Sequence, residues 1–195
     1  MLRGFPQGAV LSALMWILVA DGLLYSLNSV RYFAQGFADN FSALVIGKDL
    51  RTACEVMQAA LNRVQRWCED YGLSVNPDKT EMVLFTIKRT LAGLVPIVFF
   101  DKELERTNKV KYLGVVLDSK LTWSDHFDQK CKKATALFWQ CRRIVGSTWG
   151  KSPKICHWIY RPIIRPMITH AAVVRWPRVE LKVARAMLSR LEFRD

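Results

Sequence analysis

The segment 36–41, Gly-Phe-Ala-Asp-Asn-Phe, constrains the fold of this chain most, because it predicts a reversal between two strand-forming runs. Aromatic and apolar residues lie on both sides of it, and glycine bounds the pattern at each end. This composition predicts a short β-hairpin with Asp39 and Asn40 at its tip. Aspartate and asparagine are also frequent in ordinary turns, where they bond to their own backbone. Two interpretations therefore stay open: a stiff support for an exposed carboxylate, or a simple turn.

A second turn is predicted near the start of the chain, over Gly4, Pro6, Gln7 and Gly8. Glycine lets a ligand approach the backbone closely, and the N–H groups at the start of the helix that follows can bind a phosphate. The amide of Gln7 adds a group that can bind a sugar or a base. The alternative is a loop that only leads into the helix.

The stretch 9–27 is almost entirely apolar and about as long as a bilayer span. Asp21 interrupts it, and a charged side chain at the centre of a bilayer costs about 2.5–3.5 kcal/mol. A helix that is apolar all round also fits the core of a globular domain. We expect a core helix and no membrane partner.

The clearest amphipathic helix spans 49–71, where apolar residues recur every three or four positions and charged residues occupy the other face. Asp49 can cap its start, and Gly72 ends it. A polar turn follows and carries Lys79, just ahead of a strand predicted at 82–86. This lysine either reaches a neighbouring loop or is an ordinary exposed side chain.

Charge divides the chain in two. Residues 1–119, which end with strands predicted at 95–100 and 110–117 and their charged connection, hold 13 Lys/Arg and 12 Asp/Glu, a net charge of +1. Residues 120–195 hold 16 and 5, a net charge of +11, in a helical pattern rich in aromatic residues. Such a basic segment favours a polyanion such as nucleic acid; an acidic membrane surface and a merely solvated face are the alternatives. The basic residues selected for nucleic-acid contact are Lys130, Lys132, Lys133, Arg142 and Arg143.

The five cysteines never form a C-x-x-C pair, and with the three histidines they make no zinc pattern. They are typical of reduced thiols in an intracellular protein. No signal peptide is visible at the start of the sequence. We therefore expect a location in the cytoplasm or the nucleus, without secretion.

Four motifs in order carry a resemblance that extends over nearly the whole chain, to about Trp176. The sequence resembles reverse transcriptases of non-LTR (LINE-type) retrotransposons, and the Jockey-like insect group most of all. The motifs are Arg-Gly-Phe-Pro-Gln-Gly-Ala-Val-Leu-Ser at 3–12, Phe-Ala-Asp-Asn at 37–40, Leu-Ser-Val-Asn-Pro-Asp-Lys-Thr at 73–80 and Lys-Tyr-Leu-Gly-Val-Val-Leu-Asp at 111–118, with 121–126 and 149–154 in further support.

The resemblance implies an α+β right-hand polymerase fold. Residues 1–119 would be part of the palm, a partial antiparallel sheet with packed helices, and residues 120–195 a basic, mostly helical thumb or connection region. The reaction of the family is RNA-directed DNA synthesis, with an RNA template, a DNA primer and two Mg²⁺ ions as cofactors. Two metal ions bring the primer oxygen to the phosphate and offset the charge on the leaving group.

Site residues follow from the resemblance by position. Asp39 would bind metal, Asn40 would stand beside it in the catalytic hairpin, and Lys79 would assist departure of pyrophosphate. Gly4, Pro6, Gln7 and Gly8 would line the nucleotide and template pocket, and Tyr112, Leu113 and Gly114 would form the primer grip. The five basic residues selected above would belong to the thumb.

Two departures from the family pattern define the expected activity. Asn40 replaces the second aspartate of the hairpin, and an amide binds hard divalent cations more weakly than a carboxylate does. The family's other catalytic aspartate and its fingers precede the Pro-Gln-Gly turn, whereas this sequence starts at Met1. We expect a polymerase fragment that is inactive alone and has a fingers-palm partner in trans. The alternatives are a non-catalytic RNA- or DNA-binding module and a small membrane-associated protein that inserts 9–27.

Overall fold

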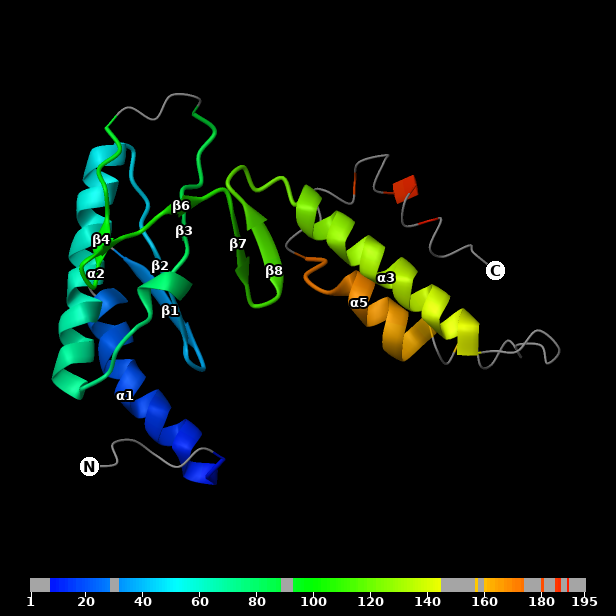
Figure 1. Ribbon diagram of the computed structural model, residues 1–195, viewed down its shortest axis with the longest axis horizontal. Helices are drawn as coiled ribbons and strands as arrows, with labels where there is room; N and C mark the ends of the chain where they lie inside the picture. Colours follow the sequence, from blue (N-terminus) through cyan, green and yellow to red (C-terminus); the bar gives the residue numbers. More distant parts are fainter. Residues whose placement is uncertain are drawn as a thin grey trace. The chain divides into compact units, whose positions relative to one another are not determined.

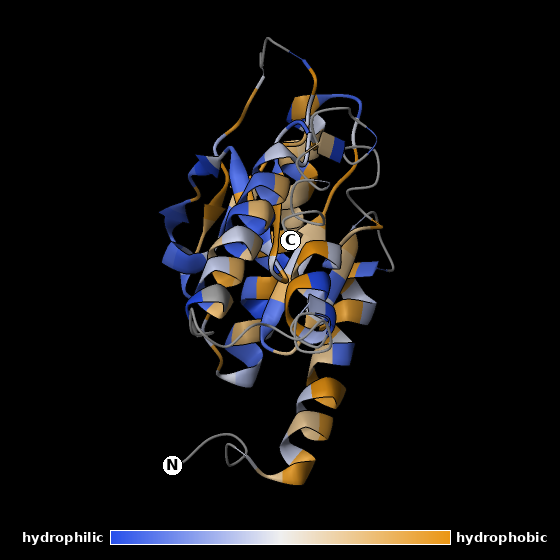
Figure 2. Ribbon diagram, turned by 90° about the vertical axis from the view of Figure 1, so that its right-hand side faces the viewer, coloured by the Kyte–Doolittle hydropathy of each residue, from blue (hydrophilic) through white to orange (hydrophobic). Residues whose placement is uncertain are grey.

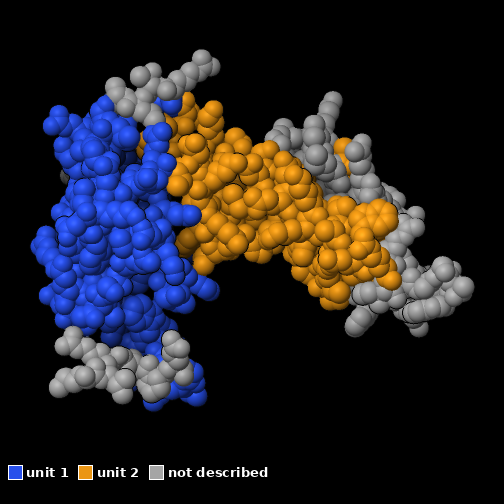
Figure 3. All heavy atoms as spheres, in the orientation of Figure 1, with its two compact units in different colours: residues 1–82, 88–106 blue, residues 83–87, 107–195 orange. Residues whose placement is uncertain are grey.

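The computed structural model describes residues 8–28, 32–88, 93–144, 157, 160–173, 180, 185–186 and 189. The chain forms two compact units (Figure 3), Met1–Met82 with Lys88–Arg106, and Val83–Ile87 with Thr107–Asp195. The division after Arg106 is one of packing. The division predicted at residue 119 is one of charge and role, and it stays a prediction.

The first unit begins with helix α1 (Val10–Asn28), and the hairpin of β1 (Phe33–Phe37) and β2 (Asn40–Leu44) follows (Figure 1). The two strands are antiparallel, and Phe37 lies opposite Asn40. The predicted hairpin is confirmed, but its two-residue turn consists of Ala38 and Asp39, so Asn40 begins β2 instead of sharing the tip. Ala38 takes a positive φ of 53°, which permits this tight reversal.

Helix α2 (Leu50–Tyr71) has the ends that the sequence predicts. The carboxylate of Asp49 accepts hydrogen bonds from the backbone N–H and the hydroxyl of Thr52, at 2.9 and 3.0 Å. Gly72 ends the helix in the left-handed region with a φ of 62°, and its N–H donates to the carbonyl of Glu69 at 3.1 Å. Both ends are thus set by local chemistry.

Two clusters of buried apolar residues lie against α2, which therefore organises the first unit. The cluster between α1, β1 and α2 contains Leu23, Leu27, Ala34 and Ala60, with Trp67 packed against it. The cluster between α2 and the later strands contains Cys54, Ile97, Phe99 and Leu104.

The first half of α1 is exposed, contrary to the expectation of a core helix along its whole length. Val10 is 94% exposed and Ile17 is 60% exposed, whereas Leu23 and Leu27 are buried. Figure 2 shows these apolar first turns extending away from the other elements of the unit. Within the described residues, α1 is long enough and apolar enough to cross a membrane, judged by length and composition alone.

The remaining strands of the first unit are shorter than predicted. β4 (Val98–Phe99) pairs antiparallel with β5 (Lys102–Glu103), because Phe100 and Asp101 both take positive φ angles and reverse the chain. The predicted strand at 95–100 therefore shrinks to two residues, and its charged connection contains β5. The 3₁₀ helix η1 (Pro77–Lys79) also belongs to this unit, whereas β3 (Met82–Val83) and β6 (Arg106–Thr107) each cross the division between the units. The strand predicted at 82–86 thus also ends early.

The second unit begins with a hairpin where the sequence predicted one strand over 110–117. β7 (Lys109–Tyr112) pairs antiparallel with β8 (Val115–Asp118), and Tyr112 lies opposite Val115. Leu113 and Gly114 form the turn with φ angles of 47° and 80°. Two successive positive φ angles are the geometry that joins twisted antiparallel strands in two residues.

Helices complete the second unit. α3 (Ser124–Ile144) is followed by the π-helical segment η2 (Tyr160–Ile164) and by α5 (Arg165–Thr169), which lies alongside α3 (Figure 1). The helical pattern predicted over 120–195 lies partly outside the described residues. Helices combined with small antiparallel hairpins agree with the predicted α+β class.

Candidate metal and nucleic-acid site

Asp39 lies exposed in the turn of the β1–β2 hairpin, beside Asn40. Its Oδ1 accepts a hydrogen bond from the Nδ2 of Asn40 at 3.2 Å. The amide thus presents its nitrogen to the carboxylate. This pairing gives the tip one carboxylate beside one amide.

Aromatic side chains anchor the hairpin. The indole Nε1 of Trp16 in α1 donates to the carbonyl of Ala38 at 2.6 Å. The ring of Phe41 in β2 lies 6.4 Å from that of Trp16 and 6.4 Å from that of Trp67 in α2, measured between centroids. The tip is therefore held by contacts with both helices, and Asp39 stands on a supported element. Sequence reasoning missed Trp16, whose only signal was an indole N–H within an apolar helix.

The side chains at this tip do not fit Mg²⁺ by themselves. Magnesium prefers about six oxygen ligands in octahedral geometry, usually with one or two carboxylates. The hairpin offers the carboxylate of Asp39 and the amide of Asn40. Over the described ranges, three or more His, Cys, Asp or Glu side chains are nowhere grouped so that they could hold a metal ion. A metal site built on Asp39 needs at least one further carboxylate.

Lys79 ends η1, also in the first unit, and is exposed. The side chain of Asn76 accepts the N–H of Asp78 at 2.9 Å and so starts this short helix. Asp78 forms an ion pair with Lys102 of β5, which ties η1 to the β4–β5 hairpin. Gly8 is exposed with a φ of 86°, and the other pocket residues, Gly4, Pro6 and Gln7, lie outside the described residues.

The residues predicted as the primer grip lie at the end of the β7–β8 hairpin in the second unit. Tyr112 is half-buried at the end of β7, and Leu113 and Gly114 form the exposed turn. His170, just after α5, lies over this turn, since a Cβ built on Gly114 would be 3.5 Å from its Cε1. The residues predicted as the grip therefore form a turn between strands, and His170 lies against this turn.

Asp118 ends β8 and fixes the approach to α3. Its Oδ2 accepts hydrogen bonds from the N–H and the hydroxyl of Thr122, both at 3.0 Å, and its Oδ1 accepts the N–H of Trp123 at 3.0 Å. Burial raises the pKa of Asp118, but these hydrogen bonds outweigh burial and hold the pKa below its ordinary value. In the first turn of α3, Asp125 forms an ion pair of 2.8 Å with Lys109 of β7.

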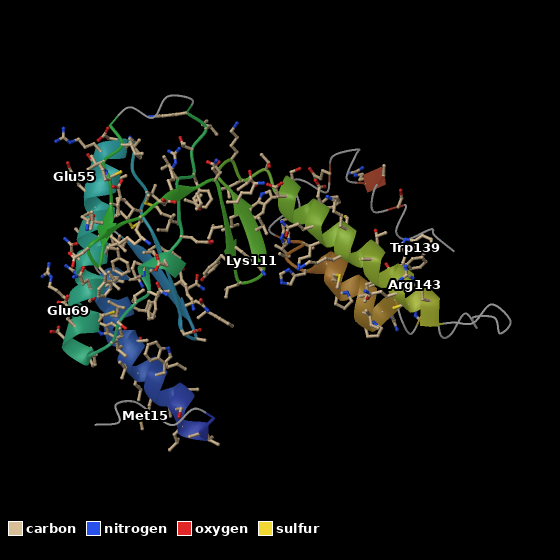
Figure 4. The ribbon with its side chains drawn as sticks, in the orientation of Figure 1. Met15, Glu55, Glu69, Lys111, Trp139 and Arg143 are labelled. Atoms are coloured by element: carbon tan, nitrogen blue, oxygen red, sulfur yellow. The ribbon has the colours of Figure 1, made fainter. Side chains whose placement is uncertain are left out.

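The basic residues selected from the sequence share one helix, α3. Lys132, Lys133 and Arg143 are exposed, and Lys130 is half-buried; the side chain of Arg142 lies outside the described residues. Trp139 is 41% exposed, and Figure 4 shows it with Arg143 on the last turns of α3.

Helical spacing places Lys132, Trp139 and Arg143 on one face of α3. Trp139 lies seven residues after Lys132, close to two helical turns, and Arg143 lies eleven residues after Lys132, close to three. Ala134 is fully buried, so it lies on the side of α3 that packs within the unit. The exposed face combines positive charge with an aromatic ring, which suits phosphate neutralisation and base stacking.

His126 is a residue of this unit to which the sequence gave no role beyond the absence of a zinc pattern. It is 1% exposed in the first turn of α3, and its Nδ1 accepts the N–H of Val116 in β8 at 3.1 Å. The imidazole thus joins α3 to the β7–β8 hairpin. Its sequence signal, a histidine in the motif at 121–126, did not reveal a partner ten residues earlier.

Comparison with protein families gives one match that covers more than half of the chain. The family described as reverse transcriptase (RNA-dependent DNA polymerase) matches residues 1–117. This region contains the hairpin with Asp39, Lys79 and the β7–β8 turn. No solved structure gives a significant match.

Curated relatives agree with this family. The "Probable RNA-directed DNA polymerase from transposon BS" of Drosophila melanogaster is 25% identical over 199 aligned residues, which cover 96% of this chain and 22% of the relative. A retrovirus-related Pol polyprotein from the type-1 retrotransposable element R1 of Bradysia coprophila is 26% identical, over 97% of this chain and 19% of the relative.

A third relative comes from the Jockey-like group that the sequence motifs indicate. The RNA-directed DNA polymerase from the mobile element jockey of Drosophila melanogaster is 30% identical over 129 residues, which cover 63% of this chain and 14% of the relative. The chain thus spans about a fifth or less of the length of these three relatives. The resemblance to polymerases of non-LTR retrotransposons is confirmed, and the chain belongs to the reverse transcriptase family.

Proposed function

We propose that this chain is the palm and thumb portion of a retrotransposon RNA-directed DNA polymerase, and that it contributes a catalytic hairpin and contacts to an RNA template and a DNA primer. Asp39 carries the proposal, because it stands on a supported hairpin tip within the region matched by the reverse transcriptase family. In this proposal residues 1–119 belong to the palm and residues 120–195 to the thumb. The protein acts inside the cell.

Asp39 is proposed as a metal ligand that needs a partner. One carboxylate and one amide do not hold Mg²⁺ against water, so the described hairpin supports no catalytic step by itself. A second carboxylate from a fingers-palm segment supplied in trans would make a site of the required charge. We therefore expect no DNA synthesis by this chain alone.

The β7–β8 turn and α3 are proposed to hold the primer–template. Lys132, Lys133 and Arg143 would neutralise backbone phosphates, and Trp139 would stack on a base or a sugar. Lys79 is proposed to lie near the leaving pyrophosphate. These roles need no chemistry from the chain beyond binding and positioning.

The test is primer extension on a poly(A) template with an oligo(dT) primer and Mg²⁺. The unmodified chain and its Asn40→Asp variant are each assayed with and without the fingers-palm segment of a related element. Extension only with the added segment supports the proposal, and stronger extension by Asn40→Asp shows that the hairpin limits metal binding. Asp39→Asn is the matched control, and it should abolish every activity seen.

A non-catalytic RNA- or DNA-binding module is the second candidate, which the basic face of α3 favours. Salt-sensitive binding of the primer–template without extension in any combination would support it over the polymerase. The exposed apolar first half of α1 keeps membrane association as a third outcome. That outcome requires the chain to stay with vesicles after alkaline carbonate extraction.

A further inference from the structure

The contact between His126 and Val116 joins two elements that the proposed function uses together. Val116 is the second residue of β8, two positions after Gly114, and His126 lies in the first turn of α3. The hydrogen bond from the Val116 N–H to Nδ1 measures 3.1 Å, and the imidazole is 1% exposed. A side chain this buried holds its partner with little freedom, so the bond fixes the hairpin relative to α3.

The accepted hydrogen bond assigns the protonation state of His126. Nδ1 can accept the Val116 N–H only when it carries no proton, so the proton of the neutral ring is on Nε2. Burial disfavours the charged imidazolium, and so does the positive end of the helix dipole in the first turn of α3. A second proton on Nδ1 would place a donor against the Val116 N–H and break the contact.

His170 lies near both His126 and the turn of the hairpin. Its ring centroid is 6.0 Å from that of His126, and its Cε1 lies over the turn at Gly114. The turn is thus close to one histidine, and the strand that leaves it is bound by the other.

We propose that His126 is a positioning residue, which holds the β7–β8 hairpin on α3 so that its turn can contact a nucleic-acid primer. The proposal rests on the proposed function, in which Tyr112, Leu113 and Gly114 grip the primer. Nδ1 serves as a fixed acceptor for the strand, and the neutral ring is the state that permits binding.

The predicted pH dependence has an unusual direction. Added positive charge strengthens binding to nucleic acid, so protonation of an exposed histidine on the binding face would raise affinity at low pH. Protonation of His126 would instead release the hairpin, so the affinity should fall as the pH is lowered far enough to protonate the buried ring. The titratable or charged side chains on the elements around it include Lys109, Lys111 and Tyr112 on β7, Asp118 on β8, Asp125 and Asp128 on α3, Arg165 on α5, and His170 just after α5. Of these residue types, histidine changes charge between pH 5 and 8, so His170 is the competing group to control.

Two substitutions at His126 distinguish the role of the hydrogen-bond acceptor from that of the bulk of the ring. His126→Asn places an amide oxygen near the position of Nδ1, whereas His126→Leu fills the space without an acceptor. With a fluorescent poly(A)–oligo(dT) primer–template at pH 7.5, we expect His126→Leu to bind about tenfold more weakly and His126→Asn to bind within about twofold of the unmodified chain. As the pH is lowered from 7.5, the unmodified chain should lose affinity while His126→Asn should not. His170→Asn and the exposed His157→Asn are the matched controls, and both should keep the loss.

Several results would overturn the proposal. Equal binding by the Asn and Leu variants, or an unchanged pH profile in His126→Asn, would remove the role of the acceptor. Nitrogen NMR tests the contact without nucleic acid: a proton on Nδ1 of the unmodified chain at pH 7.5, or a Val116 amide signal unaffected by His126→Leu, would also contradict it. If the unmodified chain binds no primer–template, the proposed function and the positioning role both fail. A Val116 signal that still depends on His126 would then show only that the two residues are in contact.

Discussion

At the scale of single residues, two side-chain amides take the place of neighbouring strands. Gln58 in α2 donates from Nε2 to the carbonyl of Val98 and accepts the N–H of Val98 at Oε1, both at 2.8 Å. Asn28 at the end of α1 makes the same pair of bonds with the backbone of Ala34, at 2.9 and 2.8 Å. Each amide satisfies one residue of a strand edge and attaches the strand to a helix.

Replacing Gln58 by Glu should destabilise the first unit. The carboxylate can still accept the Val98 N–H, but it cannot donate to the Val98 carbonyl and it repels that oxygen. We expect a loss of about 1–3 kcal/mol in the free energy of unfolding, measured by urea denaturation at pH 7. The exposed Gln129→Glu in α3 is the control for the change of charge. Equal stability of the two variants would show that the Val98 contact contributes nothing.

At the scale of elements, the turn of the β7–β8 hairpin depends on Gly114. Its φ of 80° lies in the region that disfavours a Cβ, although the space around it would admit one at 3.5 Å from His170. Gly114→Ala should therefore cost about 1–2 kcal/mol of stability through backbone strain alone. Thermal unfolding followed by circular dichroism measures the change.

Gly22→Ala is the matched control for that substitution. Gly22 lies inside α1, and a Cβ there would meet no atom within 4 Å. Alanine is the better helix former, so this variant should gain about 0.5–1 kcal/mol. A gain in both variants would refute the role assigned to the turn geometry.

The start of α3 should respond to acid through Asp118. Its folded pKa is depressed, because the hydrogen bonds from Thr122 and Trp123 outweigh the effect of burial. The stability it contributes is present above its ordinary pKa of 3.8 and is lost as the pH falls through the lower folded value. Asp118→Asn should therefore lower the melting temperature at neutral pH and flatten its fall in acid. An unchanged acid transition would assign that transition to other carboxylates.

Elements whose ends are set by local residues could be predicted from the sequence. Features that depend on contacts with distant parts of the chain could not. Asp49 and Gly72 bound α2 through their own side chain and backbone, and the hairpin around Asp39 also came from local composition. The β7–β8 hairpin was predicted as one strand, because β-branched residues flank Leu113 and Gly114 and resemble a continuous strand. The turn itself uses Leu113, a residue that does not indicate a turn. At the site, the contacts of Trp16 and His126 join separate elements, and residue spacing alone does not reveal such contacts.

At the scale of the whole molecule, the uneven charge predicts a salt-dependent interaction. The net charge is +12, and residues 120–195 hold +11 of it. If Lys132 and Lys133 each contact a phosphate, Lys132→Gln and Lys133→Gln should each reduce the slope of log affinity against log salt by about 0.7–0.9. Titrations of a fluorescent RNA–DNA duplex at several salt concentrations measure this slope.

The control for that experiment is the exposed Lys48→Gln, which lies before α2 and should leave the slope unchanged. Trp139→Ala should weaken binding without changing the slope, because stacking releases no counterions. Equal slopes in all variants would place the polyanion contact away from α3.

The anchoring of the hairpin has an optical consequence. The indole N–H of Trp16 is bonded to the carbonyl of Ala38, the residue next to Asp39. Indole emission depends on the polarity around the ring, so an event at the Asp39 carboxylate would change the fluorescence of a chain that carries no label. A difference spectrum against Trp16→Phe would isolate that signal from the other tryptophans. The chain thus contains a built-in reporter of its own hairpin tip, which can be read before any nucleotide is added.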